Sequence, residues 1–269
     1  MDERTEPPDT LRCRPSGCLD FQPAGTGRIA FVKAGIIAAG KGERLARGGV
    51  STPKPLILIG GEPLIARVIR AAANVPVTSI ACIVNDFNPA VADYLRSGSW
   101  PVPLELIVEN TPSSMESLFS LAPLLEEEPF ILFTVDAVFA FSVLERFIAR
   151  ASALRQAQGV LALTRFIDDE KPLWARVNRR HKILAIGEAA RPSRYITAGF
   201  YYFRPDIFEM VDSARVRRMN ALRQFLSFLL EKGYSLYGVP VAKTIDVDYP
   251  QDIEKAEIYL RKADKGRTP

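Results

Sequence analysis

The sequence has very little of the residue types on which many metal and acid–base sites depend: one histidine and three cysteines among 269 residues. Structural zinc sites usually take four Cys or His ligands, so this composition counts against such a site. Catalysis by a histidine general acid or base would rest on His181 alone, and we expect His181 to lie in a surface turn at residues 178–182. Three cysteines make no disulfide framework, which indicates a reducing compartment, and we expect a cytoplasmic protein.

Long apolar runs are also lacking. The longest candidate, residues 129–144, falls short of the roughly 20 apolar residues that a membrane helix needs, and it carries Asp136 near its middle. The start of the chain is polar and has no apolar core of a secretory signal. We therefore expect no membrane partner.

Neither sign of charge is in strong excess: 35 Lys and Arg residues stand against 31 Asp and Glu residues, a net charge of +4. The basic clusters at residues 179–182 and 215–218 are short, with few aromatic residues among them. Nucleic-acid surfaces usually combine larger basic patches with aromatic side chains. We interpret these clusters as solvated loops and expect no nucleic-acid partner.

The chain changes character near residue 29. Residues 1–28 contain four prolines, scattered glycines and no apolar periodicity, which predicts a disordered arm. From residue 29 onward, apolar runs of strand length alternate with helical stretches. The expected strands are at residues 34–39, 78–84, 104–108, 130–135 and 160–166, and the expected helices at 63–73, 88–96, 114–127 and 141–154.

This alternation predicts an α/β fold of the Rossmann-like type, a three-layer sandwich with a mostly parallel central sheet. After residue 168 the sequence pattern changes and predicts a small β-rich lobe. Its expected strands are at residues 174–177, 183–186, 195–203 and 235–239, and its expected helices at 205–211, 221–230 and 250–260. Because no linker separates the two parts, we expect residues 29–264 to form a single domain with halves 29–166 and 167–264.

The most informative local segment is Gly40-Lys41-Gly42, which follows a predicted strand and precedes Arg44. Small residues let backbone N–H groups approach an anion, and nearby cations balance phosphate charge. The segment is not a P-loop, because Gly42 replaces the Ser or Thr, and it lacks the third glycine of the dinucleotide motif, where Leu45 stands. A plain tight turn is the alternative interpretation.

Lys54 follows this segment and lies between two prolines, Pro53 and Pro55, which restrict its backbone. A stiffened lysine beside a phosphate cradle would supply a fixed positive charge. The alternative is a solvated lysine in a loop.

Acidic residues stand where strands are expected to end. Asp136 follows a buried strand, and the carboxyl edge of a parallel sheet is where ligands bind in open α/β folds. A carboxylate there is costly unless it is paired or holds a metal, with helix capping as the alternative. Asp246 and Asp248 are two residues apart, which places them on the same face of a predicted strand.

These segments together resemble the nucleotidyltransferase superfamily, whose members include sugar-1-phosphate nucleotidylyltransferases, phosphocholine and inositol-phosphate cytidylyltransferases, and the molybdenum-cofactor guanylyltransferase. The family pattern A-G-x-G-[ST]-R followed by P-K-x-L reads here as residues 39–44 and then residues 53–56. The resemblance covers about residues 32–260. Glu43 replaces the usual Ser or Thr, and Ala189 stands where many sugar-phosphate members have an acceptor-binding lysine.

The resemblance implies a role for each matching residue. Arg44 and Lys54 would be catalytic, and Mg²⁺ would be held by Asp136 and Asp248, with Asp246 the second choice for the latter. The residues implied to bind the nucleotide are Ala38, Ala39, Gly40, Lys41, Gly42, Ser114 and Ser117. Those proposed to bind the acceptor are Gly199, Arg194 and Lys243. Helix capping is the alternative for the two serines.

The resemblance implies transfer of NMP from an NTP to a phosphate monoester such as a sugar-1-phosphate, with release of pyrophosphate and dependence on Mg²⁺. The partners would be the NTP and a phosphorylated small molecule. The alternatives are a cytidylyltransferase for a choline- or inositol-type alcohol phosphate, a molybdenum-cofactor-type guanylyltransferase, a GT-A-like glycosyltransferase and a non-catalytic nucleotide-binding domain. The base, the acceptor and the oligomeric state stay open.

Overall fold

Seven strands form the central sheet of the computed structural model, which describes residues 31–167 and 171–265. In spatial order they are β12 (Leu236–Pro240), β8 (Gly159–Thr164), β11 (Ile196–Phe203), β6 (Phe130–Thr134), β1 (Val32–Ala38), β4 (Val77–Val84) and β5 (Leu104–Val108). Only β11 is antiparallel to its neighbours in this sheet, β6 and β8; the other pairs are parallel. The predicted mostly parallel sheet is therefore confirmed.

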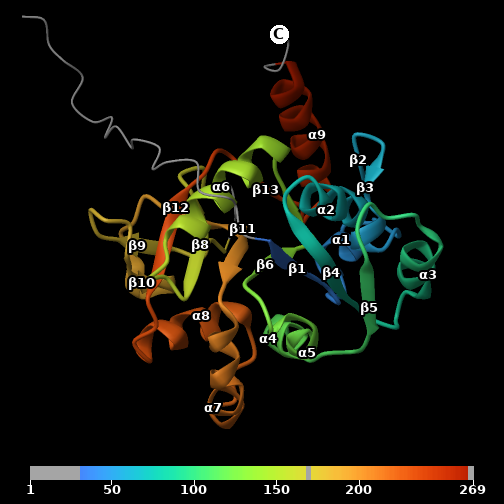
Figure 1. Cartoon of the computed structure of the whole chain (residues 1–269). Coiled ribbons are helices and arrows are strands. Elements are labelled where there is room, and N and C mark those ends of the chain that lie inside the picture. Colours follow the sequence, from blue (N-terminus) through green and yellow to red (C-terminus); the bar gives the residue numbers. More distant parts are fainter. Residues whose placement is uncertain (1–30, 168–170, 266–269) are drawn as a thin grey trace, which may run out of the picture.

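Helices cover both faces of the sheet, which makes the predicted three-layer sandwich (Figure 1). One layer consists of α2 (Leu64–Ala73), α3 (Pro89–Ser97), α6 (Phe141–Ala153) and α9 (Pro250–Lys265). The other contains α4 (Ser114–Ser120), α5 (Ala122–Leu125), α7 (Val211–Val216) and α8 (Leu222–Glu231). Ile36 of β1 packs toward the first layer and Ile37 toward the second, as alternation along a strand requires.

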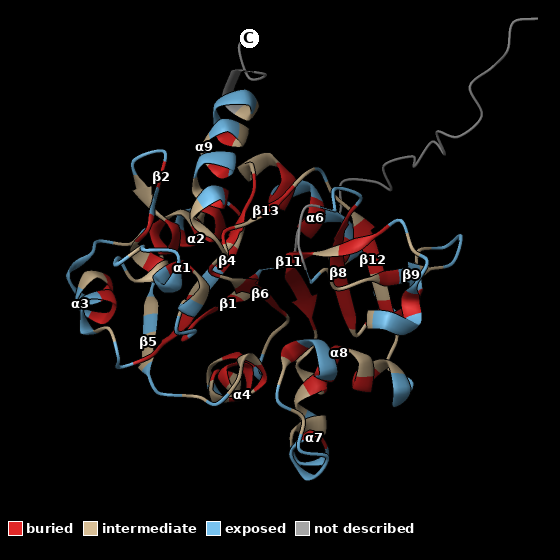
Figure 2. Ribbon diagram, turned by 180° about the vertical axis from the view of Figure 1, so that it is seen from behind, coloured by how far each residue is buried: buried red, intermediate tan, exposed pale blue. Residues whose placement is uncertain are grey.

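Burial on both faces explains why the central strands read as continuous apolar runs. All six residues of β8 are buried, as are the first four residues of β6. Figure 2 shows these strands as the buried centre of the molecule, while much of the surface of α9 is exposed.

Short elements connect the layers. They are the helix α1 (Glu43–Arg47) and the 3-10 turns η1 (Lys54–Leu56), η2 (Gly187–Ala190) and η3 (Pro205–Met210). There are also three antiparallel two-stranded pairs: β2–β3 (Leu58–Ile59, Glu62–Pro63), β9–β10 (Ala175–Val177, Ile183–Ile186) and β7–β13 (Ala137–Val138, Ile245–Asp246). In the last pair, the N–H of Val247 also donates to the carbonyl of Asp136 at 3.1 Å. This pairing returns the end of the chain to the carboxyl edge of β6.

Some expected elements are wrong in detail. The single helix expected at residues 114–127 is divided into α4 and α5, and Pro123 supplies the reason, because it lacks an N–H and its ring disfavours a continuous helix. The helix expected at residues 205–211 is a 3-10 turn followed by α7. The strand containing Asp246 ends at that residue, so Asp248 lies beyond it.

Other expectations are not tested. The arm expected at residues 1–28 lies outside the described residues, and the division of residues 29–264 into two halves stays a prediction. Among the helices of the described ranges, none combines the length and the apolar character that a membrane span requires.

Gly199 interrupts β11 at a point where the register to β8 shifts. Its φ is +78°, and a Cβ there would lie 2.5 Å from the Cβ of Ala137. We predict that Gly199→Ala lowers the free energy of unfolding by about 2–4 kcal/mol, from backbone strain together with overpacking. The control Gly233→Ala has a φ of +86° but open space around it and should cost about 1–2 kcal/mol. Equal losses in urea denaturation would show that the contact with Ala137 is easily relieved.

Candidate active site

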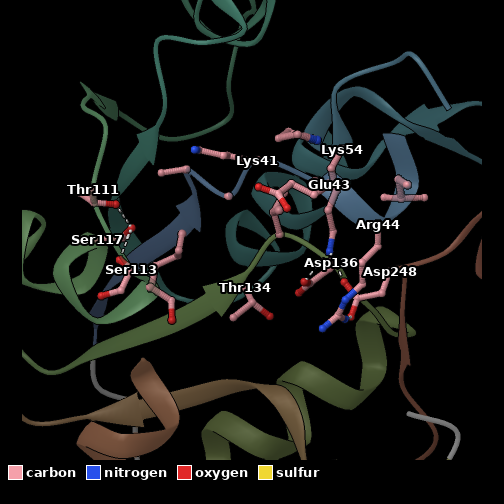
Figure 3. Close-up of a pocket in the computed structure, with 18 of the residues that line it drawn as sticks. Lys41, Glu43, Arg44, Lys54, Thr111, Ser113, Ser117, Thr134, Asp136 and Asp248 are labelled. Atoms are coloured by element: carbon pink, nitrogen blue, oxygen red, sulfur yellow. Dashed lines mark hydrogen bonds and ion pairs between the residues drawn. The ribbon is translucent and has the colours of Figure 1, made fainter. Parts of the chain in front are cut away.

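A cavity of about 640 Å³ opens at the carboxyl edge of the sheet. Its walls come from the segment after β1, from η1, from the end of β6 and from the segment that leads into α4 (Figure 3). The predicted site residues that line it are Ala39, Gly40, Lys41, Gly42, Arg44, Lys54, Ser114, Ser117, Asp136 and Asp248. Ala38 is buried behind them in β1. The fold therefore gathers most of the predicted residues into one site.

The glycine segment turns the chain from β1 into α1. Gly42 has a φ of +66° and directly precedes α1. A Cβ on Gly42 would lie 3.2 Å from the Cβ of Lys54. Glycine at this position therefore serves both the turn and the close approach of Lys54.

Lys54 is the centre of the site. Its Nζ lies 2.8 Å from Oδ2 of Asp136 and 2.8 Å from Oδ1 of Asp248, and only 11% of its side chain is exposed. Pro53 precedes the 3-10 turn that Lys54 opens, and Pro55 lies inside it. Fixed backbone on both sides thus aims this ammonium at two carboxylates that are more than a hundred residues apart in the sequence.

Arg44 completes the cluster from α1. Its Nη1 donates to Oδ2 of Asp248 at 2.6 Å, and its guanidinium lies 5.7 Å from the ring centroid of Tyr249. Two cations and two carboxylates therefore balance one another, as Figure 3 shows for Arg44, Lys54, Asp136 and Asp248.

The electrostatics follow from this pairing. Burial alone would lower the pKa of Lys54, but the charges of Asp136 and Asp248 outweigh it and raise that pKa above its ordinary value. Burial would raise the pKa of Asp136, but the charge and hydrogen bond of Lys54 outweigh it and lower that pKa. Lys54 is therefore protonated and Asp136 ionised at neutral pH.

The donor set suits a hard cation that also binds phosphate. Within the described residues, no three His, Cys, Asp or Glu side chains form a cluster that could hold a metal ion. Asp136 and Asp248 do converge on one point, the Nζ of Lys54. Mg²⁺ characteristically uses one or two carboxylates together with substrate phosphates and water, so these two residues fit it.

The two predicted serines hold the wall near α4 in place. The Ser114 hydroxyl accepts from the N–H of Leu222 at the start of α8. Ser117 is 2% exposed, and its hydroxyl donates to the carbonyl of Ser113 and lies 2.5 Å from the Thr111 hydroxyl. Ser113, rather than Ser114, caps α4 through the N–H of Glu116. The hydroxyls of Thr111 and Ser113 also belong to the cavity wall.

The predicted acceptor residues lie apart from this cavity. A smaller hollow of about 100 Å³ shares Asp248 with it and is also lined by Asp246 and Phe166. Lys243 approaches this hollow, with its Nζ 5.9 Å from the ring centroid of Phe166. Arg194 is exposed, and Gly199 is buried with its carbonyl accepting from the Thr134 hydroxyl. Their roles stay predictions.

Two further residues at the site, Phe87 and Asn85, are not among those predicted from the sequence. Phe87 lines the cavity and is 56% exposed, and the centroid of its ring lies 5.1 Å from Nζ of Lys41. Asn85 follows β4 and is hydrogen-bonded to the glycine segment. Their position just after a parallel strand could have indicated them, because such strand ends meet at one edge.

His181 lies in the turn between β9 and β10, as predicted, away from the cavity.

Comparison with known proteins agrees with this architecture. The model of the MobA-like NTP transferase domain family matches residues 34–199, more than half of the chain. The chain belongs to this family. The match covers β1, the glycine segment, Lys54 and Asp136, and it ends before Asp248. The resemblance inferred from the sequence is therefore confirmed.

Two curated relatives and one solved structure are similar to this chain over most of its length. The CMP-5'-(3-aminopropyl)phosphonate synthase of Streptomyces rubellomurinus is 28% identical over 77% of this chain and 33% of its own. The bifunctional IPC transferase and DIPP synthase of Archaeoglobus fulgidus is 27% identical over 87% of this chain and 45% of its own. The chain thus spans less than half the length of either relative.

The inositol-1-phosphate CTP transferase from T. maritima has a TM-score of 0.75 and 19% identity, covering 89% of this chain and 99% of the other. This likeness concerns the fold. It confirms the α/β architecture.

We predict that Lys54→Met lowers turnover by about 10²–10³-fold, the usual effect of removing a preorganised donor at a developing charge. It should also destabilise the metal-free protein by about 2 kcal/mol at pH 7, less than breaking a fully buried pair because the carboxylates are partly exposed. The lowered pKa of Asp136 contributes its full stability above the unfolded-state pKa of about 4. The difference should therefore shrink as the pH falls below that value.

Urea denaturation at several pH values and steady-state turnover test this prediction. Lys54→Arg should retain more stability than Lys54→Met, because it keeps the positive charge. It should recover little turnover, because a planar guanidinium replaces the compact ammonium. The control Lys33→Met removes a partner of the exposed Glu127 at 3.5 Å and should change neither quantity appreciably. Turnover equal to wild type in Lys54→Met would show that the phosphate site lies elsewhere.

Proposed function

We propose that this protein is a Mg²⁺-dependent nucleotidyltransferase that transfers NMP from an NTP to a small molecule with a terminal phosphate or phosphonate. The observation that carries the proposal is that the cluster of Lys54, Asp136 and Asp248 lines the same cavity as Gly40 and Gly42. Fixed cations, backbone N–H groups and two carboxylates are the groups that phosphoryl transfer requires. In this proposal residues 29–166 bind the NTP and residues 167–264 bind the acceptor and close the site.

The reaction needs no general base. A phosphate monoester has a second pKa of about 6, so its dianion is already a nucleophile at neutral pH. One of its oxygens forms a bond to the α-phosphorus, while the bond from that phosphorus to the bridging oxygen breaks and pyrophosphate leaves. This requirement suits a cavity without a histidine in its wall.

Each residue of the cluster has a part in that step. Lys54 would neutralise negative charge developing on the α-phosphate, and Arg44 the charge of the departing pyrophosphate. Asp136 and Asp248 would hold Mg²⁺, which when bound neutralises phosphate oxygens. Asp248 also orients Arg44 through its second oxygen, 2.6 Å from Nη1. Catalysis then consists of positioning and charge neutralisation.

Cytidylyl transfer is the form of the reaction that the relatives' names favour. One relative is a CMP-phosphonate synthase, and the similar fold from T. maritima is that of a CTP transferase. The absence of the lysine at Ala189 sets this chain apart from many sugar-phosphate members of the superfamily. We therefore propose CTP as the donor, with an alcohol phosphate or an aminoalkylphosphonate as the acceptor.

A panel of the four NTPs tests the proposal. Each NTP is combined with Mg²⁺ and with glucose-1-phosphate, inositol-1-phosphate, phosphocholine or 2-aminoethylphosphonate, and pyrophosphate release is measured. We expect release with CTP and one acceptor, a product mass equal to CMP plus acceptor minus water, and loss of the signal in a parallel preparation of Lys54→Met. No release in any combination would contradict the proposal, and turnover of a nucleoside-diphosphate sugar instead would favour a glycosyltransferase.

A further inference from the structure

Asn85 lies behind the glycine segment and is bonded to it twice. It directly follows β4, whose last residue Val84 pairs with Ala38 of β1. Its side-chain amide nitrogen donates to the carbonyl of Ala39 at 3.0 Å and to the carbonyl of Gly40 at 3.2 Å. Asn85 is 5% exposed and is not part of the cavity wall. The side-chain amide nitrogen of Asn85 therefore donates to two consecutive backbone carbonyls.

Those two hydrogen bonds determine where two N–H groups point. A trans peptide unit is planar, with its C=O and N–H in opposite directions. If the carbonyls of Ala39 and Gly40 face Asn85, the N–H groups of Gly40 and Lys41 face away from it. Gly40 and Lys41 line the cavity. The direction away from Asn85 is therefore the cavity side.

The same two N–H groups have no acceptor within the described part of the chain: neither donates a backbone hydrogen bond to another described residue. Backbone N–H groups are obligatory donors, and they are paired in the great majority of cases when they are removed from water. Two adjacent free donors on one side of a loop form a concave anion-binding element. Lys41, Arg44 and Lys54 add positive charge around it.

A second set of hydrogen bonds holds the residue that follows Asn85. The side chain of the next residue, Asp86, accepts from the amide of Asn110, and the N–H of Asp86 donates to Oδ1 of Asn110 at 3.2 Å. Asn110 precedes Thr111 of the cavity wall. The loops after β1, β4 and β5 are thus linked side to side along the carboxyl edge, which holds Asn85 in register with the glycine segment.

We propose that Asn85 is a positioning residue for the triphosphate: its amide draws the carbonyls of Ala39 and Gly40 backward and so presents the N–H groups of Gly40 and Lys41 to phosphate oxygens. Without it, one of these peptide units can rotate and turn a carbonyl oxygen toward the anion. This inference rests on the proposed function. It assigns to a residue outside the cavity a specific effect on affinity for phosphate, independent of the base.

Isothermal titration with Mg²⁺·CTP and with Mg²⁺·tripolyphosphate tests it. Asn85→Ala should raise the Kd of both by about tenfold or more, because hydrogen bonds to charged groups are among the stronger ones. The KM of the acceptor should stay within about twofold of wild type, since only the phosphate cradle changes. The matched control is Asn178→Ala, because Asn178 also makes two side-chain bonds to backbone, to the N–H groups of Arg180 and Lys182 in the β9–β10 turn. It should leave both Kd values unchanged.

Gly40→Pro provides a second route to the same result, because it deletes one of the two N–H groups directly. It should weaken both probes, and combining it with Asn85→Ala should cost less than the product of the single effects, since both act on one element. Two results would overturn the positioning role but leave the proposed function standing. One is a folded Asn85→Ala variant whose Kd values equal those of the wild type. The other is a combined variant in which the two losses multiply fully. Failure of the wild-type protein to bind either probe would overturn the proposed function with it.

Discussion

The structure of the site depends on one interaction, the ammonium of Lys54 held between the carboxylates of Asp136 and Asp248. Without a cation between them the two carboxylates would repel each other, and an ammonium buried without carboxylates would be destabilised. The fold meets this requirement from three directions. The end of β6 supplies Asp136, the proline-flanked turn supplies Lys54, and the β7–β13 pairing returns Asp248 to the same edge.

This neutral cluster also explains how the site can receive a nucleotide. Two carboxylates alone would repel a triphosphate, and two cations alone would bind any anion. In the proposed function, Asp136 and Asp248 would hold Mg²⁺, and Lys54 and Arg44 would then be available to pair with phosphate oxygens. The glycine segment of the same cavity would supply neutral backbone donors, which are not tied up in these ion pairs.

The sequence predicts the layers and the positions of the strands well where the hydrophobic pattern is strong. The expected strands at residues 104–108 and 183–186 coincide with β5 and β10, because each is a short, mainly apolar run with turn-forming residues on both sides. It does not predict the β2–β3 hairpin, although Gly60 and Gly61 both have positive φ, the signature of a tight hairpin turn. The position of Asn85 after an expected strand places it at the ligand edge of the sheet, but its two hydrogen bonds to a loop about 45 residues away come only from the tertiary structure.

A double-mutant cycle of Asp136→Asn and Asp248→Asn tests the central claim, that these acids serve one phosphate-binding centre, most directly. Each variant keeps the shape of the side chain and removes one charge, and each should lower turnover by roughly two orders of magnitude or more. Because both disable the same centre, the account predicts that the double variant loses little more than the more damaging single variant. Losses that multiply fully would contradict the account and show that the two carboxylates act separately.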